Sequence, residues 1–367
     1  MPVNTTNPVV VGAATKKDHY DRVFDNIVAL YGGEIAIAGQ AALDIVIASS
    51  AGQLDTVPTG NALEVFRKNA ANDGYEFAEL SADVDFIGGR LTLESGVAVS
   101  TTDQPSKTTL YYTPYVSNLI SLYSGTAWEV IEFAELSLSI ASITVLMPHD
   151  VFIYNNAGTA TLEILVWTNA TTRATALVKQ DGRWVKSGAT TRRYVGTLYS
   201  GGIAGGNDCS DTYAVRDLWN AYNRVMRPMR RLEATDSWTY NTNSWRQANG
   251  SAFNELRFVI GLPDVSVRAT VLHVGVLTGA EIYHIGTAIG LDSTTTPATG
   301  STVGTSLARD ALATSVTATF SGYPGIGRHR LVWLERSLWG TSNNTWYGDV
   351  GGAAPYTQSG IDGWVEG

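Results

Sequence analysis

The residues best able to do chemistry are few and scattered along the chain. The histidines are His19, His149, His273, His284 and His329. No pair of them has a metal-ligand spacing such as HExxH. The one cysteine, Cys209, has no histidine near it in sequence, so it is a weak candidate for a nucleophile. With no GxSxG elbow and no acidic calcium loop either, the sequence predicts no catalytic residue, no metal and no cofactor.

Paired carboxylates are harder to judge, because a glycoside hydrolase needs only two acids at a separation that tertiary structure sets. The last third of the chain holds five acidic candidates: Asp292, Asp310, Glu335, Asp349 and Asp362. It also holds aromatic rings able to stack on sugars: Trp339, Trp346, Tyr347 and Tyr356. Such rings also fill sandwich cores, and aspartates are common in turns. We therefore expect no enzyme, with glycan binding and glycan hydrolysis kept as alternatives.

The composition favours strands joined by tight turns. Hydrophobic residues make up 44% of the 367 residues, so the chain can bury substantial cores. Charged residues make up only 16%, and Gly, Ser, Thr and Asn replace them. The net charge of −9 argues against nucleic-acid binding, which needs clustered lysine and arginine. A single cysteine excludes a disulfide framework within the chain.

Positive charge is concentrated in one stretch of this acidic chain. Ten Lys or Arg and four Asp lie between Lys179 and Arg231, and no lysine follows Lys186. The stretch indicates either a surface for other subunits or anionic glycans, or a solvated helix face with ordinary ion pairs. The choice between these interpretations depends on which side chains the fold exposes.

The sequence indicates neither a membrane-spanning segment nor a signal peptide. No window holds 18 consecutive apolar residues, so membrane insertion is not expected. The first residues, MPVNTTNPVVVG, lack the basic region and the long apolar run of a signal peptide. We expect assembly in the cytoplasm, and this is compatible with a final place on a particle.

An amphipathic helix is predicted near the start, within a segment 1–35. Thr15 can cap it and Gly32-Gly33 can end it. Its apolar residues recur every three or four positions and so share one face: Tyr20, Val23, Phe24, Ile27, Leu30 and Tyr31. One isolated helix cannot bury that stripe, so Tyr20, Val23, Phe24, Ile27 and Tyr31 are predicted to anchor the protein to a partner or to its own copies.

Four further segments follow in the predicted architecture, which is mainly β. Residues 36–107 form a connector with short strands, and 108–200 an antiparallel β-meander whose turns include Asp181-Gly182. Residues 201–232 combine a Gly-rich joint with a second helix, capped by Ser210 or Asp211 and carrying helically spaced apolar residues. Residues 233–367 form a C-terminal β-sandwich of jelly-roll type.

Several stretches resemble structural proteins of tailed-bacteriophage virions. They are TKKDHYDRVFDNIVALYG, GNALEVFRKNAANDGYEFAEL, LYSGTAWEVIEFAELSLSI, DVFIYNNAGTATLEILVWTNATTRATALVKQDGRWVKSG, WNAYNRVMRPMRRLEATDSWTY, GYPGIGRH and SGIDGWVEG. The resemblance covers about 80% of the chain and includes a recurrent β module of tail-fibre, head-fibre and decoration proteins. It implies no catalytic residues. A collagen-like tract and a long heptad run are missing, so a short fibre, a head fibre or decoration protein, or a collar or baseplate component fits better than a long tail fibre.

The expected function is therefore that of a virion structural protein, anchored by its N-terminus and displaying a C-terminal β domain. Its expected partners are other copies, as a homotrimer, and other virion proteins. The alternative is a receptor-binding tail protein that attaches to a host-surface glycan, or less plausibly cleaves it. For that alternative the contact candidates are Trp339, Trp346 and Tyr347, because GTSNN resembles an exposed turn. The competing interpretation is that these rings close the sandwich core.

Overall fold

The computed structural model describes residues 45–50, 53–57, 64–68, 71, 75–79, 85–201, 206–278, 283–308, 312–338, 343–351 and 355–367. Contacts divide the chain into two compact units, Met1–Val84 and Asp85–Gly367. Within the described ranges the regular structure is strand, apart from one 3-10 turn at Ala248–Gly250, so the expected mainly β chain is confirmed. The predicted N-terminal helix, with Tyr20, Val23, Phe24, Ile27 and Tyr31, lies outside the described residues.

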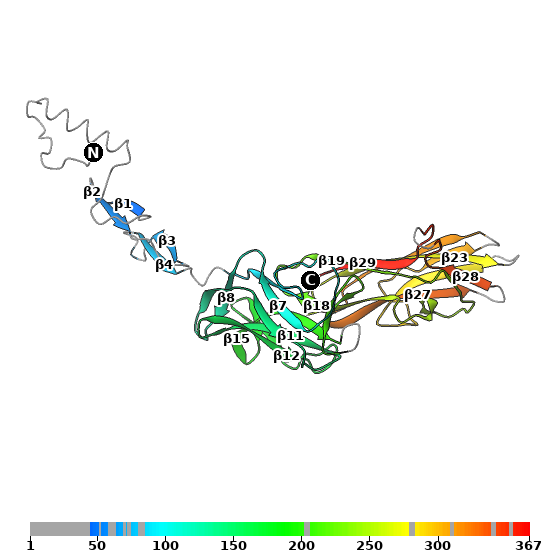
Figure 1. Ribbon diagram of the computed structural model, residues 1–367, viewed down its shortest axis with the longest axis horizontal. Helices are drawn as coiled ribbons and strands as arrows, with labels where there is room; N and C mark the ends of the chain where they lie inside the picture. The colour runs from blue at the N-terminus through cyan, green and yellow to red at the C-terminus, as the bar shows by residue number, and fades with distance from the viewer. Residues whose placement is uncertain are drawn as a thin grey trace, which may run out of the picture. The chain divides into compact units, whose positions relative to one another are not determined.

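The described strands of the first unit form two antiparallel hairpins (blue in Figure 1). The strands are β1 (Ile45–Ser50), β2 (Gln53–Val57), β3 (Glu64–Lys68) and β4 (Tyr75–Glu79). Phe66 lies opposite Phe77 in the second hairpin and stacks on Tyr75 at 5.2 Å between ring centroids. Phe66 and Tyr75 are both exposed. A lone two-stranded hairpin is marginally stable in water, so these exposed rings favour packing of the hairpin against another protein surface.

The second unit begins with eleven strands that make hairpins with their neighbours or pair over longer distances. They are β5 (Gly89–Thr92), β6 (Gln104–Lys107), β7 (Thr109–Pro114), β8 (Leu119–Tyr123), β9 (Trp128–Glu132), β10 (Leu136–Ser139), β11 (Met147–Asn156), β12 (Thr159–Val166), β13 (Leu177–Gln180), β14 (Arg183–Lys186) and β15 (Ala189–Ser200). The turns behave as predicted: Asp181 and Gly182 have φ values of 50° and 83°, which a two-residue hairpin turn requires. The expected hairpins β8–β9, β11–β12 and β13–β14 are present.

The sheet with the order β12-β11-β15-β14-β13 is a middle layer between two hydrophobic cores. On β11, Val151 and Ile153 belong to the core cluster shared with β5, β7 and β8. Phe152, between them, belongs to the other cluster, together with residues of the C-terminal strands. Successive side chains of a strand point to opposite faces, so burial of all three buries both faces of the sheet.

The predicted second helix around 210–226 is wrong, because this stretch forms short strands. They are β16 (Cys209–Asp211), β17 (Val215–Arg216), β18 (Leu218–Asn220) and β19 (Met226–Leu232). Each pairs with a strand distant in sequence or from another part of the unit: β16 with β6, β17 in parallel with β22 (Glu255–Ile260), β18 with β15, and β19 with β29 (Gly360–Glu366). These long-range pairings override the helical spacing of the apolar residues.

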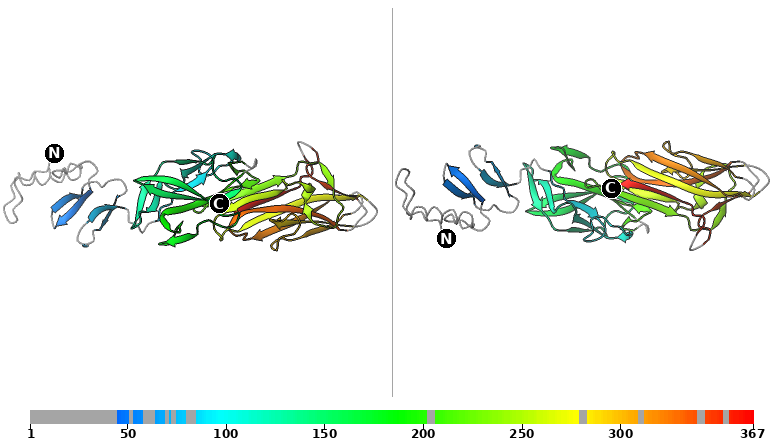
Figure 2. Two further views of the ribbon diagram at one scale, coloured as in Figure 1. Left: turned by 90° about the horizontal axis from the view of Figure 1, so that it is seen from below. Right: turned by 90° about the horizontal axis from the view of Figure 1, so that it is seen from above.

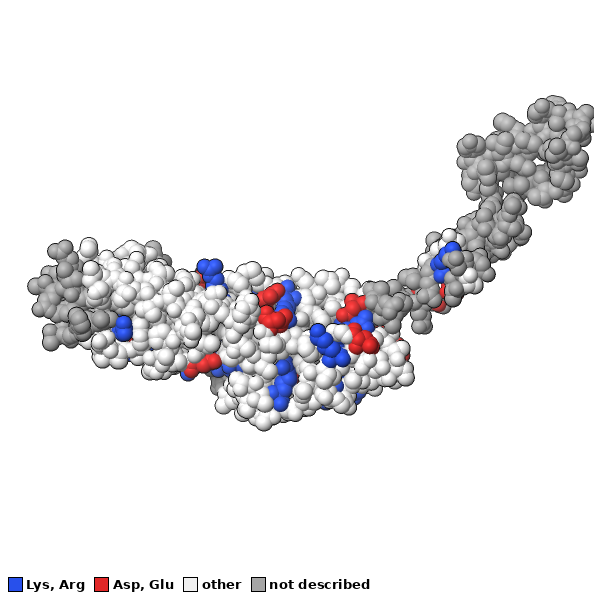
Figure 3. Space-filling model, turned by 180° about the vertical axis from the view of Figure 1, so that it is seen from behind, with Lys and Arg blue, Asp and Glu red and all other residues white. Residues whose placement is uncertain are grey.

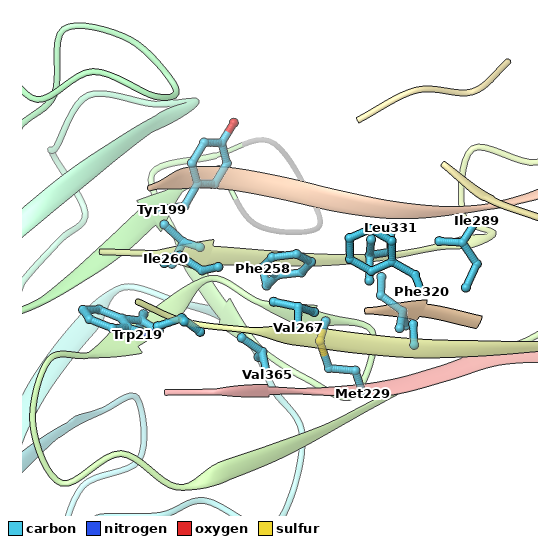
Figure 4. Close-up of a cluster of buried hydrophobic side chains, with 14 of the residues drawn as sticks. Tyr199, Trp219, Met229, Phe258, Ile260, Val267, Ile289, Phe320, Leu331 and Val365 are labelled. Carbon is cyan, nitrogen blue, oxygen red and sulfur yellow. The ribbon is translucent and has the colours of Figure 1, made fainter. Parts of the chain in front are cut away.

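The remaining strands complete two facing sheets. They are β20 (Ser237–Thr239), β21 (Arg246–Gln247), β23 (Val267–Thr278), β24 (Tyr283–Leu291), β25 (Gly304–Ala308), β26 (Thr314–Gly322), β27 (Gly327–Leu338) and β28 (Asn343–Tyr347). One sheet has the order β25-β24-β27-β22-β17-β16-β6, and the other β19-β29-β23-β28-β20 with β26 beside β23. Figure 2 shows these yellow-to-red strands running alongside one another, and Figure 4 shows Phe258, Val267, Phe320, Leu331 and Val365 in the core.

The contact between the middle layer and the sandwich depends on Gly261, at the end of β22. A Cβ atom there would lie 2.0 Å from the Tyr194 hydroxyl and 2.6 Å from the Trp219 ring. Both rings are buried. Only the absence of a side chain at Gly261 therefore lets the two layers approach this closely.

We predict that Gly261→Val lowers the free energy of unfolding by roughly 1–3 kcal/mol, because overpacking forces neighbouring rings from their positions. Chemical denaturation of the full chain measures it. Gly206→Val is the control, since a Cβ at Gly206 meets nothing within 4 Å. Equal stability of the two variants would contradict the close approach.

Candidate functional site

Trp346 lies inside the protein rather than on its surface. Its ring is fully buried with Ile285 and Val316, and it stacks on His273 at 3.9 Å between centroids. A fully buried ring cannot touch a receptor, which corrects the contact expectation at this residue and favours the core interpretation. Tyr347, the next residue on β28, is half-buried, and Trp339 lies outside the described residues.

His273 is enclosed by three tryptophans. Besides Trp346, the rings of Trp333 and Trp238 lie 4.6 Å and 5.5 Å from it. Trp333 Nε1 donates a hydrogen bond of 3.3 Å to His273 Nδ1, so the ring proton sits on Nε2. Burial holds the pKa of His273 well below its usual value, which keeps the imidazole neutral.

Glu335 on β27 ties the segment 238–249 to the sandwich. Its carboxylate accepts hydrogen bonds from Trp238 Nε1 at 2.8 Å, Arg246 Nε at 2.8 Å and the Asn249 amide at 3.1 Å. His273 Nε2 lies farther away, 3.8 Å from Oε2. Burial raises the pKa of Glu335 to about 7, against the lowering effect of Arg246. Glu335 and His273 are both fully buried, so these hydrogen bonds hold the segment 238–249 in place and are not open to a substrate.

Asp292 and Glu335, two of the acidic candidates, lie far apart. Asp292 accepts from His329 Nδ1 at 2.8 Å and from the Arg330 amide at 2.8 Å. His329 and Glu335 are six residues apart on β27, which corresponds to roughly 20 Å along a strand. Carboxylates of glycosidases stand ~5–9.5 Å apart. Asp362 is exposed on β29 opposite Arg230, and Asp310 lies outside the described residues.

Cys209, the first residue of β16, is buried in the core. Burial raises the pKa of its thiol well above the usual value, and Sγ donates to the Asp217 carbonyl at 3.2 Å. A thiol held protonated and enclosed is a poor nucleophile. Within the described ranges, no group of three or more His, Cys, Asp or Glu side chains is placed to hold a metal ion. No helix in the same ranges is long and apolar enough to cross a membrane.

Asp217, between β17 and β18, is an unusual buried carboxylate. In the described part of the chain neither of its side-chain oxygens has a hydrogen-bond partner, and Arg328 Nε lies 3.7 Å from Oδ1. Burial raises its pKa to about 7, although Arg328 and Arg257 oppose this. Sequence reasoning missed Asp217, because nothing in the neighbouring residues indicates that the strands on either side of it, β17 and β18, are buried.

A surface that combines exposed aromatic rings with arginines lies elsewhere, around β17 and β19. It carries Tyr213, Arg230, Arg231 and Phe253, of which only Arg231 is partly covered. The sequence signal for it was the basic stretch ending at Arg231, although the helix expected there is absent.

Comparison with known proteins gives no functional lead. No family model matches the chain, and no curated protein matches it. The mosquito-larvicidal Cry4Aa toxin of Bacillus thuringiensis matches 72% of this chain at 8% identity with a TM-score of 0.18, and this chain spans 50% of the toxin structure. The exo-β-1,3-galactanase of Phanerochaete chrysosporium matches 83% of this chain and 75% of its own at 9% identity with a TM-score of 0.15. Similarities this weak carry no argument about fold or activity.

We predict that Trp346→Ala costs roughly 3–5 kcal/mol of stability, because it leaves a large cavity against His273. Thermal and chemical unfolding of the full chain measure the loss. Tyr356→Ala is the control, since that ring is 80% exposed and its removal should change stability by less than about 0.5 kcal/mol. An unchanged melting temperature for Trp346→Ala would contradict the core position.

A second prediction concerns pH. The folded state keeps Asp217 protonated up to about pH 7, whereas the unfolded chain loses that proton near its ordinary value of 3.8. The stability that this group contributes is therefore full below the unfolded pKa and is lost as pH rises through the folded pKa.

Asp217→Asn should remove this dependence. The stability of the natural protein relative to the variant should fall between pH 4 and pH 7, with a slope approaching about 1.4 kcal/mol per pH unit. Asp264→Asn is the control, because Asp264 is largely exposed beside Arg224. A stability difference independent of pH would show that Asp217 is ionised throughout.

Proposed function

We propose that this chain is a structural protein of a tailed-bacteriophage virion, of the short-fibre or capsid-decoration type. Its N-terminal segment anchors it, and the strands after residue 233 form a jelly-roll-like sandwich that faces outward. It assembles as a homotrimer with other virion proteins as neighbours. The proposal assigns no catalytic step and no cofactor to the chain.

The observation that carries the proposal is the difference between the two units. Asp85–Gly367 holds the buried core clusters, whereas the described strands of Met1–Val84 are two-stranded hairpins. Phe66 and Tyr75 remain exposed on the second hairpin. A packed body preceded by segments that need a partner is the organisation expected of an anchored particle protein.

The surface supports the same proposal. Large areas of the face in Figure 3 carry neither lysine, arginine, aspartate nor glutamate. On β26 the outward positions are Ser315, Thr317, Thr319 and Ser321, which alternate with buried Val316, Ala318 and Phe320. Depletion of charge is a feature of surfaces that pack against other proteins. The phage-like stretches of the sequence point in the same direction.

The anchoring role is tested on particles assembled without their own copy of this protein and supplied with variants. Phe24→Asp together with Ile27→Asp should reduce incorporation at least tenfold, because two carboxylates cannot be buried against a partner without compensation. Mass spectrometry and cryo-EM occupancy of purified particles measure it.

The matched control is Arg22→Asp together with Ala29→Asp, which adds two carboxylates to the face of the predicted helix opposite Phe24 and Ile27. This variant should be incorporated normally. Normal occupancy of the Phe24 and Ile27 variant would refute the anchor, and absence of the natural protein from all particles would refute the virion role.

A further inference from the structure

We infer that the surface formed by β17, β19 and the residues preceding β22 binds an anionic oligosaccharide. Two neighbouring hollows lie there. One, of about 230 Å³, is lined by residues that include Ser100, Thr102, Tyr213 and Pro228. The other, of about 200 Å³, is lined by residues that include Ala214, next to Tyr213, and Phe253. Both are smaller than the ~300–1,000 Å³ of drug-sized pockets, which suits one sugar ring in each.

Each hollow has an aromatic wall with a guanidinium beside it. Tyr213 is 39% exposed and Phe253 is 59% exposed. The guanidinium carbons of Arg216 and Arg230 each lie 5.5 Å from the Tyr213 ring centre, and that of Arg231 lies 5.6 Å from the Phe253 ring centre. Exposed rings offer a flat apolar face to a sugar, and planar guanidinium groups bind carboxylates or sulfates with two parallel hydrogen bonds.

The local charge is positive although the whole chain is negative. Asp211 is shared by Arg216 and Arg227, each at 2.7 Å, while Glu255 pairs with Arg257 at 2.6 Å.

Among the described residues, no carboxylate lies within ion-pair distance of Arg230 or Arg231, and Arg231 Nε is buried without a hydrogen-bond partner. Near these hollows four carboxylates, those of Asp103, Asp211, Glu255 and Asp362, stand against six arginines: Arg216, Arg227, Arg230, Arg231, Arg257 and Arg330. The balance is positive in a chain of net charge −9. The unpaired cations select a ligand that brings its own negative charge.

The lining favours a saccharide over other anions. Thr101 and Thr102, both exposed, supply hydroxyl groups for sugar hydroxyls, and Met226 and Pro228 supply apolar surface for a ring face. A nucleic acid would need a longer basic stripe than these two hollows provide. The competing ligand is an acidic segment of another protein, and the experiment separates the two.

The inference goes beyond the virion role and does not depend on it. The probes are hexagalacturonate, a sulfated maltohexaose, neutral maltohexaose and a hexaglutamate peptide, titrated calorimetrically into the full chain at low salt. We expect binding of a charged saccharide at least tenfold tighter than that of neutral maltohexaose and of hexaglutamate, a difference of about 1.4 kcal/mol. Preference for the uronate or the sulfated probe identifies the source of the negative charge.

Two variants locate the site. Arg230→Gln with Arg231→Gln, and separately Phe253→Ala, should each weaken binding of the charged saccharide at least tenfold with unchanged unfolding midpoints. The matched control is Lys107→Gln with Lys179→Gln, which removes two positive charges elsewhere and should change affinity less than twofold.

Three results would overturn the inference: no binding of either charged saccharide, equal binding of hexaglutamate, or equal loss in the lysine control. Incorporation of the Arg230 and Arg231 variant into particles is scored separately, so failure of the ligand site leaves the virion role standing.

Discussion

The structure depends on a sheet that is buried on both faces. β11 and β15 pair over most of their length, and every residue from Arg193 to Ser200 is buried. Tyr194 joins one core cluster and Val195 the other, so the same strand closes both. Burial of two faces also requires that the charges of this layer be satisfied internally. Arg193 does so by donating to the Phe86 and Ser121 carbonyls and pairing with Asp85 at 2.7 Å.

In the second unit, buried polar side chains connect segments that are not joined by strand pairing. Arg173 pairs with Asp150 at 2.7 Å and also donates to the Gly261 carbonyl, which links the middle layer to the end of β22. Glu335 holds the segment 238–249 in the same way. These groups are enclosed, and a removed partner would leave an uncompensated charge, so their effect is on stability and specificity of the fold.

The proposed ligand surface lies where side chains are left over from such networks. Around Tyr213 the arginines outnumber the carboxylates. Asp211 is shared by Arg216 and Arg227, and Glu255 is shared by Arg257 and Arg330. A virion protein with an outward-facing body would present that surface to its surroundings, which joins the two proposals without making either depend on the other.

The sequence by itself determined the features that depend only on composition and on residues adjacent in the chain. Its low charge and its turn residues predicted a mainly β chain, and Asp181-Gly182 located a hairpin, because a positive φ is a local requirement. Only tertiary structure decided the rest. The stretch after Cys209 has helical spacing yet forms strands, since β16 pairs with β6 about a hundred residues earlier and β18 with β15. Trp346 stands beside a turn-like stretch yet is buried, because β23 and β24 bring His273 and Ile285 against it. Pairing and burial of this kind are set by residues far apart in the chain, and a local pattern carries no record of them.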